Sequence, residues 1–400
     1  MNEAVIVDFV RTPIGTIGGS LKNVQPETLL AAAFTAIMQR TNLAPHTVDE
    51  VIAGQAKQSS DQPNIARLSA LLAGLPEDTP AFTVHRQCAS SMQALLSAQQ
   101  QIQCGYSEIV LVGGVESMST ASFYLRNARF GIGNGNCEFL DPNTESQPRS
   151  QPVSVYGSFN MIQTADRIAE LYQISREECD EFSLCSQKKA VLATDSGRFE
   201  TEIIPVTIPQ IKGESKLFNT DEYPKRDVDL EKMKKLKSIF NGGVTTAGNA
   251  SGRNDGAAAA LLMTPEKAKQ YHLRPLARLI AGCAAGVDPR VMGIGPVAST
   301  KLLMKKLLSS QGIDLSDFEL IEINEAFAAQ ALACIRELNL EPEKVNVNGG
   351  AIALGHPIGC SGLRICCTLI HEMRKRNSRL GLGTICAAGG LGMSMAFESL

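Results

Sequence analysis

Cys88 is the first residue in this sequence whose type and place could support nucleophilic chemistry. It follows the predicted strand 82–84 and opens a predicted helix. The N-terminus of a helix carries a positive field, so we expect the pKa of this thiol to be lowered and the thiolate to be favoured. The small residues Ala89, Ser90 and Ser91 would let a substrate carbonyl approach the backbone. Cys88 is therefore a candidate nucleophile; the alternative is a small buried residue.

A histidine that could act as a base for a thiol lies in a glycine-rich stretch. His356 stands within residues 346–362, which contain five glycines. This pattern indicates a tight loop in which the backbone closely approaches a ligand or another strand. The glycines match neither the dinucleotide-binding motif nor the phosphate-binding loop, and residues 359–362 do not form a nucleophile elbow. His356 is thus either a general base or a loop histidine with structural hydrogen bonds.

Two more candidate side chains end predicted strands. Asn324 ends the strand 320–324, and its amide could hold a water or a carbonyl oxygen; the alternative is a helix N-cap. Cys386 ends the strand 382–386, directly before a turn with two glycines. It is either a second chemical thiol or a small buried residue.

The elements that must position these side chains alternate between short apolar runs and longer helical patterns. The sequence predicts strands over 4–10, 51–54 and 108–114 and helices over 26–39 and 90–104. Gly105 is typical of a helix C-cap. Strands separated by helices are typical of parallel sheets covered by helical layers, so the chain is predicted to have an α/β fold.

The last third of the chain repeats the order of elements of the first third. The strand predicted over 344–348 leads through glycines into a helix near Cys360, as the strand 82–84 leads into the helix near Cys88. We interpret this as a duplicated α/β unit. A pseudo-two-fold axis between the two units would bring Cys88, His356 and Cys386 together.

The middle of the chain differs from both ends in its sequence patterns and is interpreted as an insertion. It is rich in loops, and it contains helical patterns near 164–172 and 176–196. The predicted divisions are an N-terminal half over 1–120, completed by 249–270, an inserted loop domain over 121–248 and a C-terminal half over 271–400.

Composition limits the class of protein. The 400 residues carry 38 basic and 41 acidic side chains, and the formal net charge of −3 gives no basis for wholesale nucleic-acid binding. Eleven cysteines, an odd number, without a signal-peptide pattern argue against a secreted disulfide scaffold. No apolar run is long enough to span a membrane, and the scattered histidines and cysteines do not indicate a metal site. We expect a cytoplasmic protein with reduced thiols.

Five stretches together resemble the thiolase family of acetyl-CoA acetyltransferases and 3-ketoacyl-CoA thiolases. They are Val10–Gly15, Cys88–Ala94, Ala247–Gly252 with Asp255–Ala259, Asn324–Gln330 and Asn348–Gly359. The last two are highly specific in order and spacing, and the resemblance extends along nearly the whole chain. It implies a thiolase-like α/β fold of two duplicated halves in five αβαβα layers with an inserted loop domain.

The resemblance also implies a role for each candidate residue. Cys88 would carry the acyl group as a thioester, His356 would deprotonate it, and Cys386 would move the α-proton of a second acyl-CoA. Asn324, through a water, and His356 would form one oxyanion site. The backbone N–H groups of Cys88 and Ala388 would form the other.

The contacts with coenzyme A follow from the same resemblance. Ser251 would meet the pantetheine, and Lys225 or Arg226 would lie near the nucleotide. Ala247 belongs to the same predicted CoA-binding set, and Met161 would line the acyl pocket.

Four places depart from the family pattern and bear on substrate preference and turnover. His85 stands where the family usually has asparagine, and Arg86–Gln87 is less usual before the nucleophile. Ala388 replaces a glycine, and Asn160 stands beside Met161 where many members have histidine.

The implied function is reversible Claisen condensation and thiolysis of acetoacetyl-CoA or longer 3-ketoacyl-CoAs. Acetyl-CoA, CoA and 3-ketoacyl-CoA would be substrates, without a metal or redox cofactor and in a homodimer or homotetramer. Cys360 and the stretch 90–94 resemble the degradative type, while chain length and direction stay open. The alternatives are a decarboxylating ketoacyl synthase, against which Cys386 argues, and a non-catalytic acyl-CoA-binding protein, motivated by His85 and Ala388.

Overall fold

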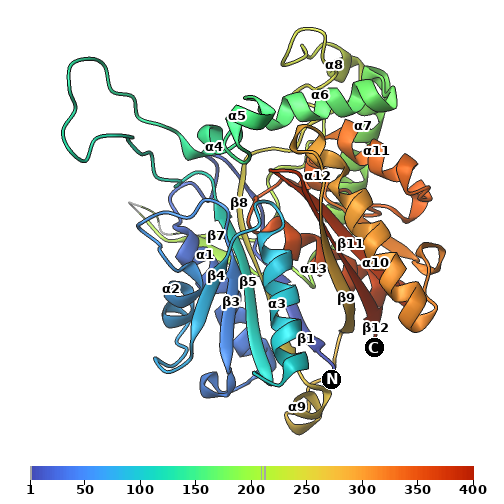
Figure 1. Ribbon diagram of the computed structural model, residues 1–400. Coiled ribbons are helices and arrows are strands. Elements are labelled where there is room, and N and C mark those ends of the chain that lie inside the picture. The colour runs from blue at the N-terminus through green and yellow to red at the C-terminus, as the bar shows by residue number, and fades with distance from the viewer. Residues whose placement is uncertain (1, 209, 211–212) are drawn as a thin grey trace.

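The protein is built around one large mixed sheet, shown in Figure 1 as a computed structural model that describes residues 2–208, 210 and 213–400. The strands of this described part follow the order β10-β11-β12-β9-β1-β8-β5-β3-β4, with β2 beside β8. Their bounds are β1 (Val5–Arg11), β2 (Gly15–Thr16), β3 (Glu50–Gly54), β4 (Ala81–Val84), β5 (Ile109–Ser117), β8 (Asn254–Met263), β9 (Ala277–Gly286), β10 (Leu320–Ile323), β11 (Leu380–Ala387) and β12 (Leu391–Ser399).

The two halves of the sheet have similar pairing and meet where β1 lies antiparallel to β9. Strand β3 runs parallel to β4 and β5 in one half, and β10 runs parallel to β11 in the other. The pairs β5–β8, β8–β1, β9–β12 and β11–β12 are antiparallel. The prediction of parallel sheets was therefore only partly right. A tight turn at 388–390 returns β11 directly as β12, and strands joined in this way run antiparallel.

The prediction of a strand over 344–348 is wrong. Only Val345 pairs, in an isolated bridge with Ile321, after a short 3-10 helix at Pro342–Lys344. Asn346 has a left-handed φ of 44°, which a continuing strand does not accommodate. Its side chain takes the place of a strand neighbour, since it accepts from the N–H of Ile323 at 2.8 Å and donates to the carbonyl of Ile323 at 2.9 Å.

Helices cover both outer faces of the sheet halves and fill the space between them (Figure 1). Leu29 and Phe34 of α1 pack into the outer core of the N-terminal half, and Leu303 and Leu307 of α10 pack into that of the C-terminal half. The central core contains residues of both α3 and α13, and these helices pack against each other. The predicted five layers are confirmed. The helices are α1 (Pro26–Thr41), α2 (Ile65–Leu72), α3 (Ser90–Cys104), α10 (Gly295–Gln311), α11 (Ala328–Glu337) and α13 (Ser361–Arg376).

The segment between β5 and β8 carries most of the remaining elements. Helices α6 and α7 confirm the two predicted helical patterns, and a short antiparallel pair, β6–β7, is an addition to them. The division of the chain at 120, 248 and 270 stays a prediction. The bounds are α4 (Pro142–Glu145), α5 (Val153–Tyr156), α6 (Met161–Tyr172), α7 (Arg176–Asp195), β6 (Val206–Ile208), β7 (Lys216–Phe218), α8 (Leu230–Lys234), and, outside this segment, α9 (Pro265–Gln270) and α12 (Ala351–Leu354).

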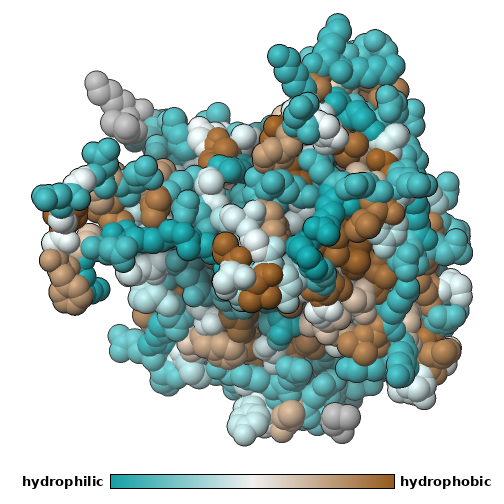
Figure 2. All heavy atoms as spheres, turned by 45° about the horizontal axis from the view of Figure 1, so that its top comes forward, coloured by the Kyte–Doolittle hydropathy of each residue, from teal (hydrophilic) through white to brown (hydrophobic). Residues whose placement is uncertain are grey.

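An arm of residues 121–141 projects from the body of the molecule before α4 (Figure 1). Figure 2 shows brown, apolar side chains among the teal polar ones of the arm. Phe130 is 98% exposed, and Phe123, Ile132 and Phe139 are also exposed. The single chain therefore presents an unusual amount of aromatic surface at this place.

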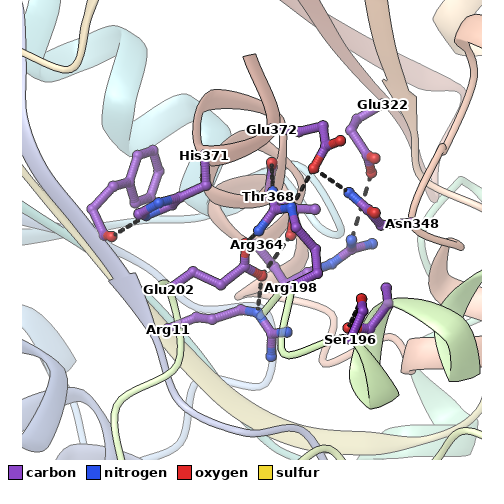
Figure 3. A network of polar contacts seen from close by, with 12 residues as sticks. Arg11, Ser196, Arg198, Glu202, Glu322, Asn348, Arg364, Thr368, His371 and Glu372 are labelled. Atoms are coloured by element: carbon purple, nitrogen blue, oxygen red, sulfur yellow. Dashed lines mark hydrogen bonds and ion pairs between the residues drawn. The ribbon is translucent and has the colours of Figure 1, made fainter. Parts of the chain in front are cut away.

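A buried network of charges joins three distant parts of the chain (Figure 3). Glu202, which follows α7, accepts from the side chain of Arg11 at 2.7 Å and pairs with Arg198 at 3.3 Å. Arg198 also pairs with Glu372 of α13, whose carboxylate accepts from Asn348 at 2.8 Å. Buried charges are tolerated when they are paired and hydrogen-bonded. The ion pairs of this network link the inserted segment to both halves.

Candidate active site

A cavity of about 340 Å³ contains Cys88, His356 and Cys386 in its lining. These three side chains come from the turn between β4 and α3, the loop between α12 and α13, and the end of β11. Residues almost 300 positions apart along the chain are thus brought to one place. The structure therefore brings together the three side chains that the sequence singled out for thiol chemistry.

A strained turn presents Cys88 to the cavity. Gln87, directly before it, has a φ of 50°, a left-handed conformation that is uncommon for a residue with a side chain. The Ser90 hydroxyl closes the turn, since it accepts from the N–H of Arg86 at 2.9 Å and donates to the carbonyl of Gln87 at 2.6 Å. The side chain of Gln87 donates to the Ser150 hydroxyl at 3.1 Å. Strain that the surroundings hold in place is common at functional sites.

The resting Cys88 is a thiol, contrary to the prediction of a lowered pKa. Burial raises the pKa of Cys88 to about 11. The N–H groups of Ala388 and Cys88 and the charge of Lys57 lower it, but they do not offset the loss of hydration. Helix α3 begins at Ser90, two residues after the cysteine, so its N-terminal field acts less directly than the sequence suggested. A base is therefore required before Cys88 can attack.

His356 is a neutral imidazole whose tautomer follows from its hydrogen bonds. Its Nδ1 lies 2.6 Å from the Ser361 hydroxyl oxygen, and that hydroxyl donates to the carbonyl of Pro357 at 2.9 Å. Since the Ser361 proton is used in this way, Nδ1 must carry the proton of the ring and Nε2 keeps its lone pair. Burial, with a smaller contribution from Arg364, lowers the pKa of His356 to about 3.

A close approach that requires Gly355 fixes the backbone around this imidazole. Gly355 has φ 104° and ψ 164°, a region that is essentially restricted to glycine. A Cβ there would lie 2.6 Å from the side chain of Asn254. The same Asn254 accepts from the N–H of His356 at 2.9 Å. The glycine-rich stretch is thus needed for a close approach of two chain segments, as the sequence indicated.

Cys386 and Ala388 line the same cavity as Cys88 and come from the end of β11 and the turn that follows it. Burial, reinforced by the neighbouring Cys88 thiol, raises the pKa of Cys386 well above its usual value. Ala388 follows two residues later, and its N–H lowers the pKa of Cys88 by hydrogen bonding to the sulfur. The left-handed residues of this turn are Gly389 and Gly390, not Ala388, so the alanine Cβ is accommodated.

Asn324 lies behind the cavity and is not part of its lining. It follows β10 and is fully buried, and its backbone N–H donates to the carbonyl of Thr384 at 2.9 Å. Neither its amide nitrogen nor its amide oxygen has a protein partner in the part of the chain that the structure describes. The next residues, Ala326 and Phe327, do line the cavity. The amide can therefore serve a water or a substrate oxygen near the wall. The alternative, an N-cap for α11, is excluded because Phe327 holds that position.

The predicted CoA-binding residues fall in two adjoining cavities. Ser251, Ala247 and Met161 line the cavity of Cys88. Lys225 and Arg226 line a second cavity of about 440 Å³. Ala247 and Tyr223 line both, which connects them. The guanidinium of Arg226 already pairs with Asp195 at 2.7 Å, so Lys225 is the less committed cation.

Protein-family models match most of the chain. A family model described as the N-terminal domain of thiolase matches residues 4–266, and one described as the C-terminal domain of thiolase matches residues 273–399. The chain belongs to the thiolase family.

Individual thiolase relatives match over their whole length. The acetyl-CoA acetyltransferase of Allochromatium vinosum is 44% identical over 403 residues, which are 100% of both proteins. A probable acetyl-CoA acyltransferase of Staphylococcus aureus is 44% identical over 98% of this chain and 97% of its own length.

Solved thiolase structures have the same fold. The acetyl-CoA acetyltransferase of Bacillus anthracis has a TM-score of 0.95 at 45% identity and covers 100% of this chain and 99% of its own. Human mitochondrial 3-ketoacyl-CoA thiolase in complex with CoA has a TM-score of 0.92 at 38% identity and covers 100% of this chain and 98% of its own. The thiolase fold predicted from the sequence is confirmed.

The departures from the thiolase pattern have different structural consequences. Asn160 caps α6, since its side chain accepts from the N–H of Gln163 at 3.0 Å. In return, the side-chain oxygen of Gln163 accepts from the N–H of Asn160 at 2.9 Å. His85 is exposed, and it does not line the cavity. Ala388 keeps the N–H that the site uses.

Sequence reasoning missed two residues of this thiolase site. Lys57, in the loop after β3, lines the cavity beside Cys88 and donates to the Ser146 hydroxyl. Ser361, at the start of α13, sets the tautomer of His356. Lys57 could have been noticed as a cation shortly after a buried strand, at the edge of the sheet where ligands bind. No pattern in the sequence singled out Ser361.

Metal-binding clusters and membrane-spanning helices are both absent from the described ranges 2–208, 210 and 213–400. Within them, the His, Cys, Asp and Glu side chains form no group of three or more that could hold a metal ion. No helix in these ranges is both long and apolar enough to cross a bilayer.

Proposed function

We propose that this thiolase is a CoA-dependent acyltransferase that makes and cleaves 3-ketoacyl-CoA through an acyl thioester on Cys88. The observation that carries the proposal is the meeting of Cys88, a neutral His356 and Cys386 in one cavity. One thiol, one base and a second thiol are the groups that acyl transfer followed by α-proton removal requires.

The first half-reaction acylates Cys88. The Nε2 atom of His356 takes the thiol proton, and the thiolate attacks the thioester carbon of acetyl-CoA. The N–H groups of Cys88 and Ala388 stabilise the oxyanion that forms. Cys386 gives its proton to the departing CoA thiolate, so CoA leaves as a thiol. After this step Cys88 is an acetyl thioester, His356 is an imidazolium and Cys386 is a thiolate.

The second half-reaction forms the carbon–carbon bond. The Cys386 thiolate removes an α-proton from a second acyl-CoA, whose enolate oxygen is stabilised by the His356 imidazolium and by a water on Asn324. The carbanion attacks the Cys88 thioester, and the Cys88 thiolate leaves and recovers its proton from His356. Thiolysis is the same sequence in reverse, since each proton returns to its starting group.

Acetyl-CoA, CoA and 3-ketoacyl-CoA are the proposed substrates, with Ser251, Ala247, Met161 and Lys225 as the contacting residues. The names of the relatives support this, since one group is called acetyl-CoA acetyltransferase and a structural neighbour is a 3-ketoacyl-CoA thiolase in complex with CoA. The scheme requires no metal or redox cofactor, because every step is a proton transfer or a nucleophilic attack by a side chain. The proposed place of action is the cytoplasm, in fatty acid metabolism.

The assembly is proposed to be a homodimer or a homotetramer. The exposed aromatic side chains of the arm at 121–141 support self-association, since apolar surface of this kind is usually covered in the working form. Light scattering after size-exclusion chromatography tests this; a monomer would contradict it.

The activity is tested by thiolysis of acetoacetyl-CoA and of longer 3-ketoacyl-CoAs, with Cys386→Ser as the diagnostic variant. This variant should accept an acetyl group on Cys88 and fail in condensation. Condensation that proceeds only with malonyl-CoA and releases carbon dioxide would favour a decarboxylating synthase. Binding of acetyl-CoA without any turnover would favour a non-catalytic binding protein.

A further inference from the structure

The cavity of Cys88 has a cationic lining that the proposed mechanism does not use. Lys57 and Arg253 both line it, and none of the described lining residues is an aspartate or a glutamate. Neutral polar side chains also line this cavity, among them those of Gln87, Asn143, Ser146, Gln147 and Ser150.

The Lys57 ammonium has N–H donors beyond the one that contacts Ser146. Its Nζ donates to the hydroxyl of Ser146, and an ammonium group has three N–H bonds to offer. No carboxylate in the described ranges forms an ion pair with it. The largest acidic influence on Lys57 is that of Glu116, ahead of Asp141, but the Glu116 carboxylate accepts from the backbone N–H groups of Ala56, Lys57 and Gly359 at 2.9–3.1 Å. Burial accordingly lowers the pKa of the Lys57 ammonium.

Arg253 adds a second positive charge, whose ion pair with a carboxylate is long. Its Nη1 is 3.9 Å from the carboxylate of Asp141, longer than a charge-assisted hydrogen bond. The positive charge of Arg253 also contributes to the lowered pKa of Lys57, so the two cations are close enough to repel each other. A bound anion would relieve this repulsion.

Lys57 lines the cavity of Cys88 but not the cavity of Lys225, from which CoA would enter. The cavity of Cys88 joins the cavity of Lys225 through Tyr223 and Ala247. Lys57 and its partner Ser146 line only the cavity of Cys88. The Lys57 charge nevertheless acts on the Cys88 sulfur, so it lies beside the acyl group that this sulfur would carry.

We propose that Lys57, assisted by Arg253, binds a carboxylate at the far end of the acyl chain, so that the preferred 3-ketoacyl-CoA is one whose chain ends in a carboxylate. This inference rests on the proposed thiolase function. A chain that ends in a methyl group would leave a desolvated ammonium without a partner, which is costly. A carboxylate would supply a charge-assisted hydrogen bond at the same place.

The bonds that change in the reaction remain those of the proposed mechanism. In thiolysis the Cys88 thiolate attacks the C3 ketone, the C2–C3 bond breaks, and the acetyl-CoA carbanion takes a proton from Cys386. The carboxylated acyl group stays on Cys88 until a CoA thiolate, whose proton has gone to Cys386, displaces it. Lys57 forms no bond with a reacting atom in this scheme and would contact the carboxylate, so it is a specificity-determining residue.

The test compares two 3-ketoacyl-CoAs of equal chain length. One is 3-oxoadipyl-CoA, whose six-carbon acyl chain ends in a carboxylate, and the other is 3-oxohexanoyl-CoA, which ends in a methyl group. Thiolysis of each is measured as kcat and KM for the full-length protein, Lys57→Met, Lys57→Arg and Arg253→Met. Methionine keeps an unbranched side chain without the charge, and arginine is the matched variant that keeps the charge.

The expected result is a preference of the wild type for the carboxylate chain by about 10- to 100-fold in kcat/KM, the size expected of one charge-assisted contact. Lys57→Met should abolish this preference, chiefly through KM for 3-oxoadipyl-CoA. Lys57→Arg should retain most of it, and Arg253→Met should reduce it.

Two results would overturn the inference and leave the thiolase function standing. One is a wild type that prefers the methyl-ended chain. The other is a Lys57→Met variant that loses kcat equally on both substrates and keeps the wild-type ratio of their kcat/KM values, because Lys57 would then act only on the Cys88 thiol. Absence of thiolysis on every substrate, acetoacetyl-CoA included, would instead overturn both proposals together.

Discussion

Cys88 and His356 are both uncharged at rest. Burial raises the pKa of the thiol to about 11 and lowers that of the imidazole to about 3, so neither group ionises near neutral pH. Proton transfer between them must therefore accompany substrate binding, when the thioester brings its own dipole into the cavity. This differs from cysteine enzymes that hold a thiolate–imidazolium pair in the free state.

The pH dependence of Cys88 alkylation tests this resting state. Because only the thiolate reacts, the rate with iodoacetamide should rise about tenfold per pH unit from about pH 7 to 9 without a plateau. The rate is measured by peptide mass spectrometry, and Cys88→Ser identifies the peptide. A plateau that is reached below about pH 8 would show a preformed thiolate and contradict the assignment.

Ser361 is a positioning residue for His356. Ser361→Ala removes the acceptor of the Nδ1 proton, so the ring can adopt the wrong tautomer and present an N–H to Cys88. We expect kcat to fall about 10- to 100-fold with little change in KM. Ser361→Thr keeps the hydroxyl and should recover much of the rate. An equal loss in both variants would indicate a packing defect in α13.

At the scale of elements, short glycine turns place the reacting groups at the ends of strands and helices. Gly355→Ala tests this, since its φ of 104° and its 2.6 Å approach to Asn254 leave no room for a Cβ. We expect a loss of about 1–3 kcal/mol in the free energy of unfolding and nearly complete loss of thiolysis. Both are measured, by denaturant unfolding and by acetoacetyl-CoA cleavage.

Gly312→Ala is the matched control for that variant. Gly312 also has a left-handed φ, 68°, at the C-cap of α10, but a Cβ there would meet open space. It should lose about 1 kcal/mol of stability and keep its activity. Full activity in Gly355→Ala would mean that the His356 loop tolerates the displacement, against our account.

Most elements could be predicted from sequence because their signals are local. The α3 helix with its Gly105 cap and the buried strand β5 follow from apolar patterns alone. The stretch 344–348 could not be predicted correctly, because an Asn346 side chain replaces backbone pairing there. No local pattern indicated the role of Ser361, which depends on its contact with the His356 ring. Lys57 follows a buried strand, but its place beside Cys88 depends on segments that only the folded chain brings near.

At the scale of the whole molecule, the two halves and the inserted segment share a buried charge network. Glu372 accepts from Arg198, Asn348 and Arg376, and these contacts lower its pKa to about 2 from a usual 4.5 despite burial, which acts in the opposite sense. Arg198 comes from the inserted segment and Glu372 from α13, so this contact links parts that are far apart in sequence. Sequence alone does not predict such pairing, since nothing local distinguishes these residues from solvated charges.

The pH dependence of stability tests the network. A carboxylate with a lowered pKa stabilises the fold fully above its unfolded pKa, near 4.5, and this contribution is lost as pH falls through about 2. Glu372→Gln should therefore lower the free energy of unfolding by about 1–3 kcal/mol at neutral pH, and the difference should shrink between those two values.

The exposed pair of Glu341 and Lys344 provides the control for Glu372→Gln. Glu341→Gln should change stability by less than about 0.5 kcal/mol. Both variants are unfolded in denaturant at a series of pH values. A deficit in Glu372→Gln that stays constant from neutral to strongly acidic pH would contradict the ionic role of this residue.

Acylation of Cys88 is the central claim, and it can be measured directly by mass spectrometry. After brief incubation with acetyl-CoA alone, the protein and its Cys386→Ser variant should each carry one acetyl group, located on the Cys88 peptide and removed by added CoA. Cys88→Ser should carry none. An acetyl thioester that persists in Cys88→Ser, or a wild type that binds acetyl-CoA and remains unmodified, would contradict the account.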